Sequence, residues 1–276
     1  MPYLTIMQVA YLDFNPGVFQ NIFLVFMFII ETRCEFNVEK DSFLSDIPSL
    51  CPANISIHGL ILARAGSKGI VNKNLAQIQG ISLLGKTIKA MTAFKKFSSI
   101  WVSTDGRKIA DEAQKFGANV HWRKKETATD TATSLFAMQE FLSSNQEIEN
   151  IALLQCTSPF LQIKYLNSAY ELMQQGFDSV FSATREYKLR WTENFEGDIE
   201  PLNFDPASRP RRQDWNGELI ENGMFYFTRK NFIEKGLIQA GRIGIVEIPK
   251  YFNIEIDTIE DLKLAQLLSA NFEYNS

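Results

Sequence analysis

Short apolar runs alternate with helix-periodic segments along most of this 276-residue chain, and that alternation constrains the fold more than any other feature. Buried strands are predicted at Leu60–Ala63, Ile100–Ser103, Asn119–Trp122, Ile151–Gln155, Asp178–Ala183, Asn222–Phe227 and Ile243–Ile248. Amphipathic helices are predicted at Ile81–Phe94, Arg107–Phe116, Thr133–Leu142 and Tyr165–Gln174. Alternating strands and helices form right-handed βαβ units, so the pattern predicts an α/β fold with a mostly parallel sheet flanked by helices.

The first predicted strand runs into a glycine-rich basic loop. Arg64, Lys68 and Lys73 follow one another closely, with Gly66 and Gly69 between them. Glycines let backbone N–H groups approach a ligand, and these donors together with three cations suit a polyphosphate. A solvated surface turn is the alternative. Because ligands of parallel sheets bind beyond the carboxyl ends of the strands, this loop marks the expected site.

Several other classes of function find no support in the sequence. GxxxxGK[ST] and GxGxxG are both absent, which argues against a P-loop kinase and a dinucleotide-binding Rossmann domain. The net charge of −4 argues against a general nucleic-acid binder. With two histidines and no GxSxG motif, His-driven nucleophilic catalysis is not expected. Three cysteines form neither a zinc spacing nor a disulfide framework.

Two carboxylates near the C-terminus form a candidate metal site. Glu255 and Asp257 alternate with isoleucines, so on a strand they face the same side. Two hard oxygen ligands can hold Mg²⁺, which keeps its other positions for water and phosphate. Thr258 is predicted to cap the helix that follows. A plain solvated strand edge is the alternative interpretation.

A proline-rich, polar segment, residues 187–222, interrupts the alternation and is predicted to be an inserted arm. Its arginines Arg209, Arg211 and Arg212 can each make two-pronged hydrogen bonds to a carboxylate, which suits an acidic sugar. A basic surface patch or a nuclear-import-like stretch explains the same residues equally well.

Residues 1–50 are predicted to form a hydrophobic leader. Ile22–Ile30 is an unbroken apolar run that fits a signal-peptide core, or, with Val18 included, a marginal membrane anchor. An N-x-S sequon starts at Asn54, and Cys34 and Cys51 could pair in an oxidising lumen. We therefore expect the secretory pathway, namely the Golgi lumen or its membrane; the nucleus or cytoplasm is the alternative.

Seven motifs give the chain a specific resemblance. They are ILARAGSKGIxxKN (residues 61–74), WVSTD (101–105), FGAxVHxR (116–123), QCTSPFL (155–161), DSVFSATR (178–185), RPRRQDWNGELIENGMFYF (209–227) and IEIDTIEDL (254–262). In this order they resemble the sialic acid cytidylyltransferases, or CMP-N-acetylneuraminate synthetases, from about residue 57 to residue 268. The arm resembles the animal branch, whose members often carry a phosphatase-like C-terminal domain that we expect to be absent here.

The resemblance implies a Rossmann-like, glycosyltransferase-A-like nucleotidyltransferase domain over residues 51–276, which forms CMP-sialic acid and pyrophosphate from CTP and sialic acid. Family positions for the nucleotide correspond to Arg64, Ser67, Lys68, Lys73, Asn74, Arg123 and Ser134. Those for the sugar correspond to Gln155, Arg209, Arg212, Gln213 and Tyr226, and those for Mg²⁺ to Glu255 and Asp257. The implied catalytic residues are Arg64, Lys73, Arg212 and Asp257.

The resemblance also implies a homodimer, because relatives are dimers in which the arm reaches the neighbouring sugar site. The family usually has Asp where Glu255 stands, and the longer side chain is expected to shift the metal by about 1 Å. Asp105, Asp257 and metal-bound water all remain candidates for the general base. Two other functions also remain: activation of another 2-keto acid sugar such as KDO, whose enzymes lack the RPRRQDW arm, and a non-catalytic nucleotide- or sugar-binding relic.

Overall fold

The computed structural model describes residues 55–66 and 69–270. The chain divides into two units, Met1–Ala53 and Asn54–Ser276, and the described residues belong to the second. The predictions for the hydrophobic leader, for the sequon at Asn54 and for a Cys34–Cys51 pair lie outside the described residues. Ser67 and Lys68 of the basic loop lie outside them as well.

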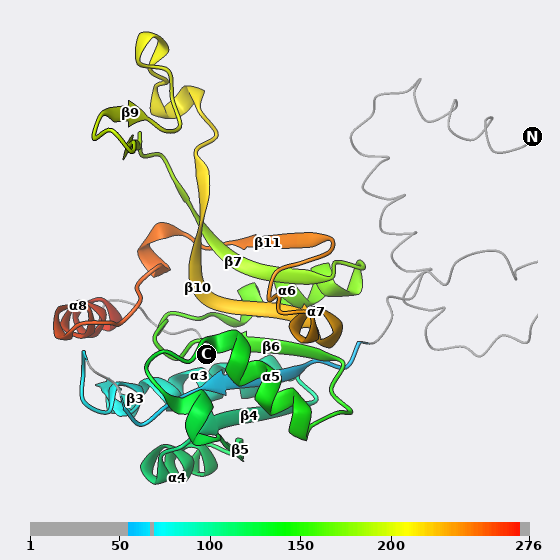
Figure 1. The fold of residues 1–276 in the computed structure, drawn as a ribbon. Coiled ribbons are helices and arrows are strands. Elements are labelled where there is room, and N and C mark those ends of the chain that lie inside the picture. The colour runs from blue at the N-terminus through cyan, green and yellow to red at the C-terminus, as the bar shows by residue number, and fades with distance from the viewer. Residues whose placement is uncertain (1–54, 67–68, 271–276) are drawn as a thin grey trace, which may run out of the picture. The chain divides into compact units, whose positions relative to one another are not determined.

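A seven-stranded sheet forms the centre of the second unit, in the order β11-β7-β10-β6-β1-β4-β5 (Figure 1). Its strands are β1 (His58–Leu62), β4 (Ser99–Thr104), β5 (Asn119–Trp122), β6 (Asn150–Leu154), β7 (Ser179–Glu186), β10 (Glu218–Arg229) and β11 (Ile243–Glu247). The pairs β6–β1, β1–β4, β4–β5 and β7–β11 are parallel, and only β10 is antiparallel to its two neighbours. The prediction of a mostly parallel sheet is therefore confirmed.

Helices pack on both faces of the sheet (Figure 1). They are α3 (Leu83–Phe94), α4 (Arg107–Lys115), α5 (Ser134–Ser144), α6 (Ile163–Gln174), α7 (Lys230–Glu234) and α8 (Ile259–Ser269). Buried side chains of α3, α4, α6 and α8 form one apolar core, and those of α5 and α7 form a second, smaller core. Both faces of a parallel sheet are thus covered, as its apolar strands require.

Caps explain where two of these helices begin. The Oγ of Ser82 accepts a hydrogen bond from Gly85 N at 2.9 Å, so α3 starts after Ser82 and not at the predicted Ile81. Ile81–Ser82 instead forms the short strand β3, paired with β2 (Gln77–Ile78). At α8, Thr258 and Asp261 form a reciprocal capping box, which confirms the predicted cap at Thr258.

Strand β10 is longer than predicted and shortens the arm. Residues 218–221 pair with β7 (Glu218 with Glu186, for example), so the arm covers residues 187–217 and not 187–222. The register shifts between Glu221 and Tyr226, where Gly223 adopts a φ of 74°. A bulge of this kind re-aims the side chains on either side of it. The sequence prediction failed here because it assigned the polar start of β10 to the preceding irregular segment.

The segment before α8 is not a strand, which corrects the prediction for residues 254–257. Ile256 N donates to the Thr157 carbonyl at 2.8 Å, and this hydrogen bond ties the segment to the loop after β6. Ile256 is fully buried while Glu255 and Asp257 are exposed, so the predicted alternation of side chains still holds.

The arm contains β8 (Trp191–Glu193), β9 (Ile199–Pro201) and the 3-10 turns η3 (Pro206–Ser208) and η4 (Arg212–Asp214). Strands β8 and β9 form a separate antiparallel hairpin, and the arm leaves the sheet from the ends of β7 and β10 (Figure 1). Among the described residues, no helix has both the length and the apolar character needed to cross a bilayer.

Candidate active site

Two interactions with carboxylates hold the basic loop after β1 in place. Arg64 forms an ion pair with Asp130, which lies just before α5. The carboxylate of Asp105, directly after β4, accepts a hydrogen bond from Ala65 N at 2.8 Å. Both carboxylates come from segments that follow neighbouring strands, so the expected convergence at the carboxyl edge of the sheet is present.

Asn74 anchors the other end of the loop from inside the protein. It is 6% exposed, and its Nδ2 donates to the Arg64 carbonyl at 3.0 Å. Its Oδ1 accepts from the Cys156 Sγ at 3.1 Å. Burial raises the pKa of the Cys156 thiol to about 12, so this group is a structural donor and not a nucleophile. Asn74 therefore holds the loop and does not face an open site.

Lys73, in the 3-10 turn η1 (Lys73–Leu75), meets the predicted metal pair. Its Nζ lies 2.9 Å from Asp257 Oδ1. The Oγ1 of Thr157 donates to Glu255 Oε1 at 3.5 Å. The backbone of the loop also approaches closely, since a Cβ on Gly69 would lie 2.4 Å from the Asp257 carbonyl oxygen. Glycine is thus required where the loop crosses the segment that carries the two carboxylates.

The two carboxylates have the chemistry of a divalent-cation site. Glu255 is exposed overall, but partial desolvation of its carboxylate raises its pKa, and the neighbouring charge of Asp257 raises it further because the two negative charges repel each other. A cation between them would relieve that repulsion. No group of three or more candidate metal ligands occurs in residues 55–66 and 69–270. A site with two carboxylates nevertheless suits Mg²⁺, which commonly takes one or two carboxylates and substrate phosphates.

Arg123 and Ser134, the two residues predicted to contact the nucleoside, lie directly after β5 and at the start of α5. Arg123 directly follows β5, and its backbone N–H donates to the Thr104 carbonyl at 2.9 Å. Burial lowers the pKa of the Arg123 guanidinium. Ser134 is the exposed first residue of α5, where the helix N-terminus attracts negative charge. Both residues therefore face the same sheet edge as the basic loop.

Gln155 and Tyr226 belong to neighbouring parts of the sheet, next to β6 and on β10. Gln155 follows β6, and its N–H donates to the Met224 carbonyl at 3.1 Å. The buried Tyr226 hydroxyl donates to Glu221, and both burial and this hydrogen bond raise the pKa of Tyr226. A Cβ on Gly223 would lie 3.8 Å from a Glu255 oxygen and 4.0 Å from the Tyr226 hydroxyl. The β10 bulge therefore brings Tyr226 close to Glu255.

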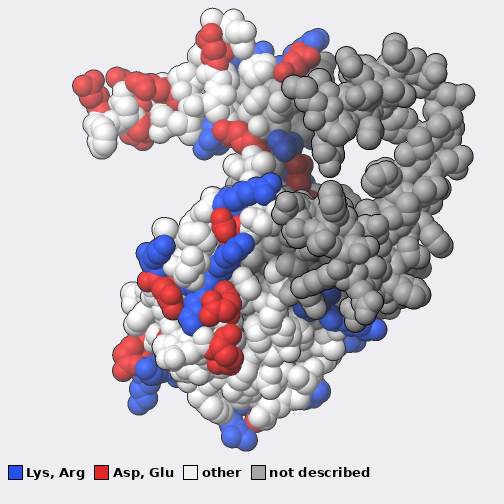
Figure 2. All heavy atoms as spheres, turned by 90° about the vertical axis from the view of Figure 1, so that its right-hand side faces the viewer, with Lys and Arg blue, Asp and Glu red and all other residues white. Residues whose placement is uncertain are grey.

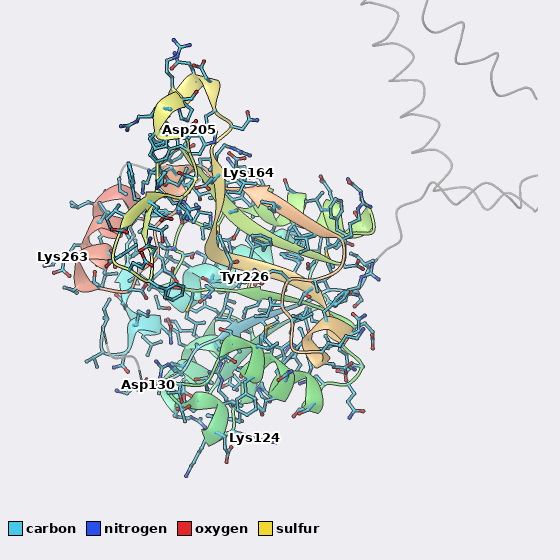
Figure 3. All side chains as sticks on the ribbon, turned by 45° about the horizontal axis from the view of Figure 1, so that its top comes forward. Lys124, Asp130, Lys164, Asp205, Tyr226 and Lys263 are labelled. Atoms are coloured by element: carbon cyan, nitrogen blue, oxygen red, sulfur yellow. The ribbon has the colours of Figure 1, made fainter. Side chains whose placement is uncertain are left out.

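Arg209, Arg212 and Gln213 of the arm do not lie at the carboxyl edge of the sheet of their own chain. The guanidinium of Arg209 lies 5.6 Å from the Phe204 ring centre, and that of Arg212 lies 5.1 Å from the Tyr187 ring centre. Gln213 is exposed in η4. Figure 3 shows the arm, marked by Asp205, extending away from the region around Asp130. Within the described ranges, no hydrogen bond or ion pair links these three side chains to the sheet edge.

Sequence reasoning missed Asp130, Thr157 and Glu221, which bind Arg64, Glu255 and Tyr226 respectively. Asp130 lies in the segment that follows β5, so the rule that ligand-binding residues follow parallel strands could have flagged it. Glu221 could not be found this way, because its role depends on the bulge in the antiparallel strand β10.

A family model described as cytidylyltransferase matches residues 58–273. N-acylneuraminate cytidylyltransferase A of Danio rerio is 44% identical over 79% of this chain and 52% of its own length. The rainbow-trout (Oncorhynchus mykiss) N-acylneuraminate cytidylyltransferase is 43% identical, over 79% of this chain and 51% of its own. The chain thus spans about half the length of these fish relatives. Pseudaminic acid cytidylyltransferase of Campylobacter jejuni is 30% identical, over 76% of this chain and 94% of its own length.

Solved structures show the same fold at lower identity. A CMP:2-keto-3-deoxy-manno-octonic acid synthetase complexed with CTP superposes with a TM-score of 0.61 at 17% identity, covering 79% of this chain and 99% of its own. The 4-diphosphocytidyl-2C-methyl-D-erythritol synthase of Anaerococcus prevotii gives a TM-score of 0.59 at 17% identity, covering 79% and 98%. These likenesses confirm the predicted Rossmann-like nucleotidyltransferase fold. The family match over residues 58–273 and the relatives of 30–44% identity show that the chain belongs to the cytidylyltransferase family.

Proposed function

We propose that the chain activates sialic acid, converting CTP and N-acylneuraminate to CMP-N-acylneuraminate and pyrophosphate. The oxygen of the sugar anomeric hydroxyl attacks the α-phosphorus of CTP and forms a new P–O bond. The bond from that phosphorus to the bridging oxygen breaks, pyrophosphate leaves, and the hydroxyl loses its proton. The fish relatives named for this acid sugar support the substrate class.

The observation that carries the proposal is the arrangement of Lys73 between the basic loop and the two carboxylates. Its ammonium lies 2.9 Å from Asp257, on the loop that also carries Arg64. Both cations would face the triphosphate and offset the negative charge that grows on its oxygens during transfer, which is where phosphoryl-transfer enzymes gain most of their rate. Glu255 and Asp257 would hold Mg²⁺, which neutralises phosphate charge when bound.

We further propose that the protein works as a homodimer in which each arm completes the partner's sugar site. The arm's own arginines Arg209 and Arg212 lie on aromatic rings and away from the sheet edge of their chain. The arm also exposes large apolar side chains, including Trp191 at 52% and Phe195 fully. Apolar side chains on an extended segment are stabilised when they are covered by a second protein surface.

For location we propose the secretory pathway, with the Golgi lumen or membrane as the destination and possible membrane association through residues 18–30. The support is the apolar run Ile22–Ile30 and the sequon at Asn54. Fractionation of cells that express the full tagged chain, followed by glycosidase treatment, tests this. A glycosidase-sensitive shift in membrane fractions is expected, whereas recovery in the nucleus or cytosol contradicts it.

The experiment that tests the reaction is pyrophosphate release by the full chain from CTP, Mg²⁺ and N-acetylneuraminate, with Asp257→Ala as the control. Release that the substitution abolishes supports the reaction and the role of Asp257. If the wild-type chain binds CTP but releases no pyrophosphate, a binding relic is favoured. If release occurs only with KDO or another 2-keto acid sugar, the substrate assignment is wrong.

A further inference from the structure

A buried polar cluster lies beneath Arg123, outside the loop and the carboxylate pair. Ser103 of β4 and His121 of β5 are direct neighbours in the strand register. Ser103 is fully buried, and Glu140 on α5 is 8% exposed. The surrounding core is apolar, with Phe141 packed edge-to-face on the His121 ring at 5.2 Å. Burying polar groups and a carboxylate here is costly unless they satisfy one another.

The side chains form a continuous chain of contacts from Glu140 to Arg123. The Nε of Arg123 donates to Ser103 Oγ at 3.3 Å. Ser103 Oγ lies 3.1 Å from His121 Nδ1, and His121 Nε2 lies 3.4 Å from Glu140 Oε1. Each end of the chain is therefore fixed by a charged group.

Hydrogen-bonding capacity sets the direction of this chain. Arginine can only donate, so the Ser103 oxygen accepts from it and keeps its own proton for His121 Nδ1. The imidazole proton must then sit on Nε2, where it faces the Glu140 carboxylate. A doubly protonated ring would leave the buried Ser103 hydroxyl without an acceptor. Burial lowers the pKa of His121, the charge of Glu140 opposes this shift, and the charges of Arg123 and Lys124 add to it. The lowered pKa agrees with a neutral ring.

The contacts from Glu140 to Ser103 restrict the position of the Arg123 guanidinium. Its Nη1 donates to the Thr127 carbonyl at 3.5 Å, so two sides of the guanidinium are held. Arg123 Nη2 and Glu140 Oε2 are both buried without a hydrogen-bond partner among the described residues, and the Glu140 charge favours the charged guanidinium. Asp105, directly after β4, is a second carboxylate whose charge favours the charged guanidinium, so Glu140 supplies one of two countercharges to Arg123.

We propose that Glu140 is a positioning residue that acts through His121 and Ser103 to fix the Arg123 guanidinium for the nucleotide. The proposal rests on the proposed function, since it takes the nucleotide to be CTP. A displaced arginine weakens nucleotide binding and leaves the acid-sugar side untouched, because Gln155 follows β6 and Tyr226 lies on β10.

Kinetics of the full chain test the proposal, with pyrophosphate release measured for wild type, Glu140→Leu, Glu140→Gln and Ser103→Ala. Glu140→Leu removes the carboxylate that faces His121 Nε2 at 3.4 Å and is expected to raise KM for CTP about tenfold, with KM for N-acetylneuraminate unchanged. Glu140→Gln should recover most of the loss, because its amide oxygen can still face the His121 Nε2–H. Thr87→Val removes a buried hydroxyl on α3 and should leave both KM values unchanged.

A readout that does not depend on activity separates this proposal from the reaction itself. Held by a buried oxygen, the Arg123 Nε–H should exchange slowly with solvent and give a sharp signal in ¹⁵N NMR. The signal is expected to broaden in Ser103→Ala and Glu140→Leu at temperatures well below the melting temperature of each variant. An unchanged signal, or KM values for both substrates that rise together, overturns the proposal. If wild type releases no pyrophosphate, the CTP dissociation constant replaces KM, and equal constants in wild type and Glu140→Leu overturn it too.

Discussion

The carboxyl edge of the sheet and the arm both carry arginine and lysine, but they hold these side chains differently. At the sheet edge, Arg64 pairs with Asp130 and Lys73 with Asp257, and each partner comes from a distant part of the chain. In the arm, Arg209 and Arg212 lie over aromatic rings, and neither is in an ion pair within residues 55–66 and 69–270. Exposed acidic residues of the β8–β9 hairpin, Glu193, Glu196, Asp198 and Glu200, crowd the arm surface at the top of Figure 2.

The nucleotide half and the sugar half of the proposed site therefore differ in how firmly a single chain holds their charged side chains in place. In the nucleotide half, Arg64 and Lys73 are already held against carboxylates of the same chain. Preorganised charges of this kind need little rearrangement when charge develops on a phosphate. Among the described residues of the arm, Arg209 and Arg212 are in no ion pair, whereas Arg190 and Arg211 pair with Glu218 and Asp214. Cations without a carboxylate partner are expected of groups that receive a carboxylate from a bound acid sugar.

The largest effect is expected from removing Lys73. Lys73→Met should lower kcat for pyrophosphate release by about 10²–10³-fold, the usual result of removing one preorganised charge from a transition state. Lys89→Met, on the exposed side of α3, removes the same charge elsewhere and should change the rate less than twofold, within about 0.5 kcal/mol. Similar rates for the two variants would mean that the sheet edge is no more preorganised than the surface.

Mixed dimers test whether the arm serves the partner's site. Lys73→Met and Arg212→Ala are each expected to be nearly inactive, but chains carrying one substitution each can pair so that one site of a mixed dimer is intact. Random pairing then restores about a quarter of the wild-type rate in a coexpressed mixture. Lys73→Met coexpressed with Asp257→Ala should recover nothing, because both residues belong to the sheet edge. No recovery in the first mixture means that each arm acts on its own chain.

Gly69→Ala tests whether the backbone of the basic loop packs against the segment that carries Glu255 and Asp257. The added Cβ would meet the Asp257 carbonyl oxygen at 2.4 Å, so the free energy of unfolding should fall by about 1–3 kcal/mol. Gly66→Ala is the matched control: nothing lies within 4 Å of its Cβ, and a change under about 0.5 kcal/mol is expected. Denaturant unfolding of the full chain measures both. Equal losses would show that the loop does not pack on the carboxylate segment.

The smallest effect concerns the length of one side chain. Glu255→Asp should raise kcat several-fold, because a metal displaced by about 1 Å slows an in-line transfer. The shorter carboxylate also loses the Thr157 hydrogen bond, so metal affinity should be measured in parallel by titration with Mn²⁺. Thr157→Val separates the two effects, since it removes that hydrogen bond and keeps Glu255. A rate equal to wild type shows that the longer side chain does not misplace the metal.

Much of the fold was predictable because each strand and helix is specified locally. β5 occupies Asn119–Trp122 as predicted, and α4 and α6 differ from their predictions by one or two residues. The basic loop after β1 was expected at the carboxyl edge of the sheet, and Asp105 and Gln155, which follow β4 and β6, lie at the same edge. Predictions failed where local pattern and tertiary pairing disagree. The polar start of β10 pairs with β7, and Glu255 and Asp257 lie in an irregular segment that hydrogen bonds to the backbone and side chain of Thr157 hold in place.

The sequence by itself determined the family, the α/β architecture and the set of charged residues, because motifs and periodicity are properties of neighbouring residues. Only the tertiary structure decided which charges meet. Arg64 and Asp130 are 66 residues apart, and Lys73 and Asp257 are 184 apart. It likewise placed Glu140 beneath Arg123 and kept the arm's arginines away from the edge of their own sheet. Contacts over such separations depend on strand order and register, which local sequence does not encode.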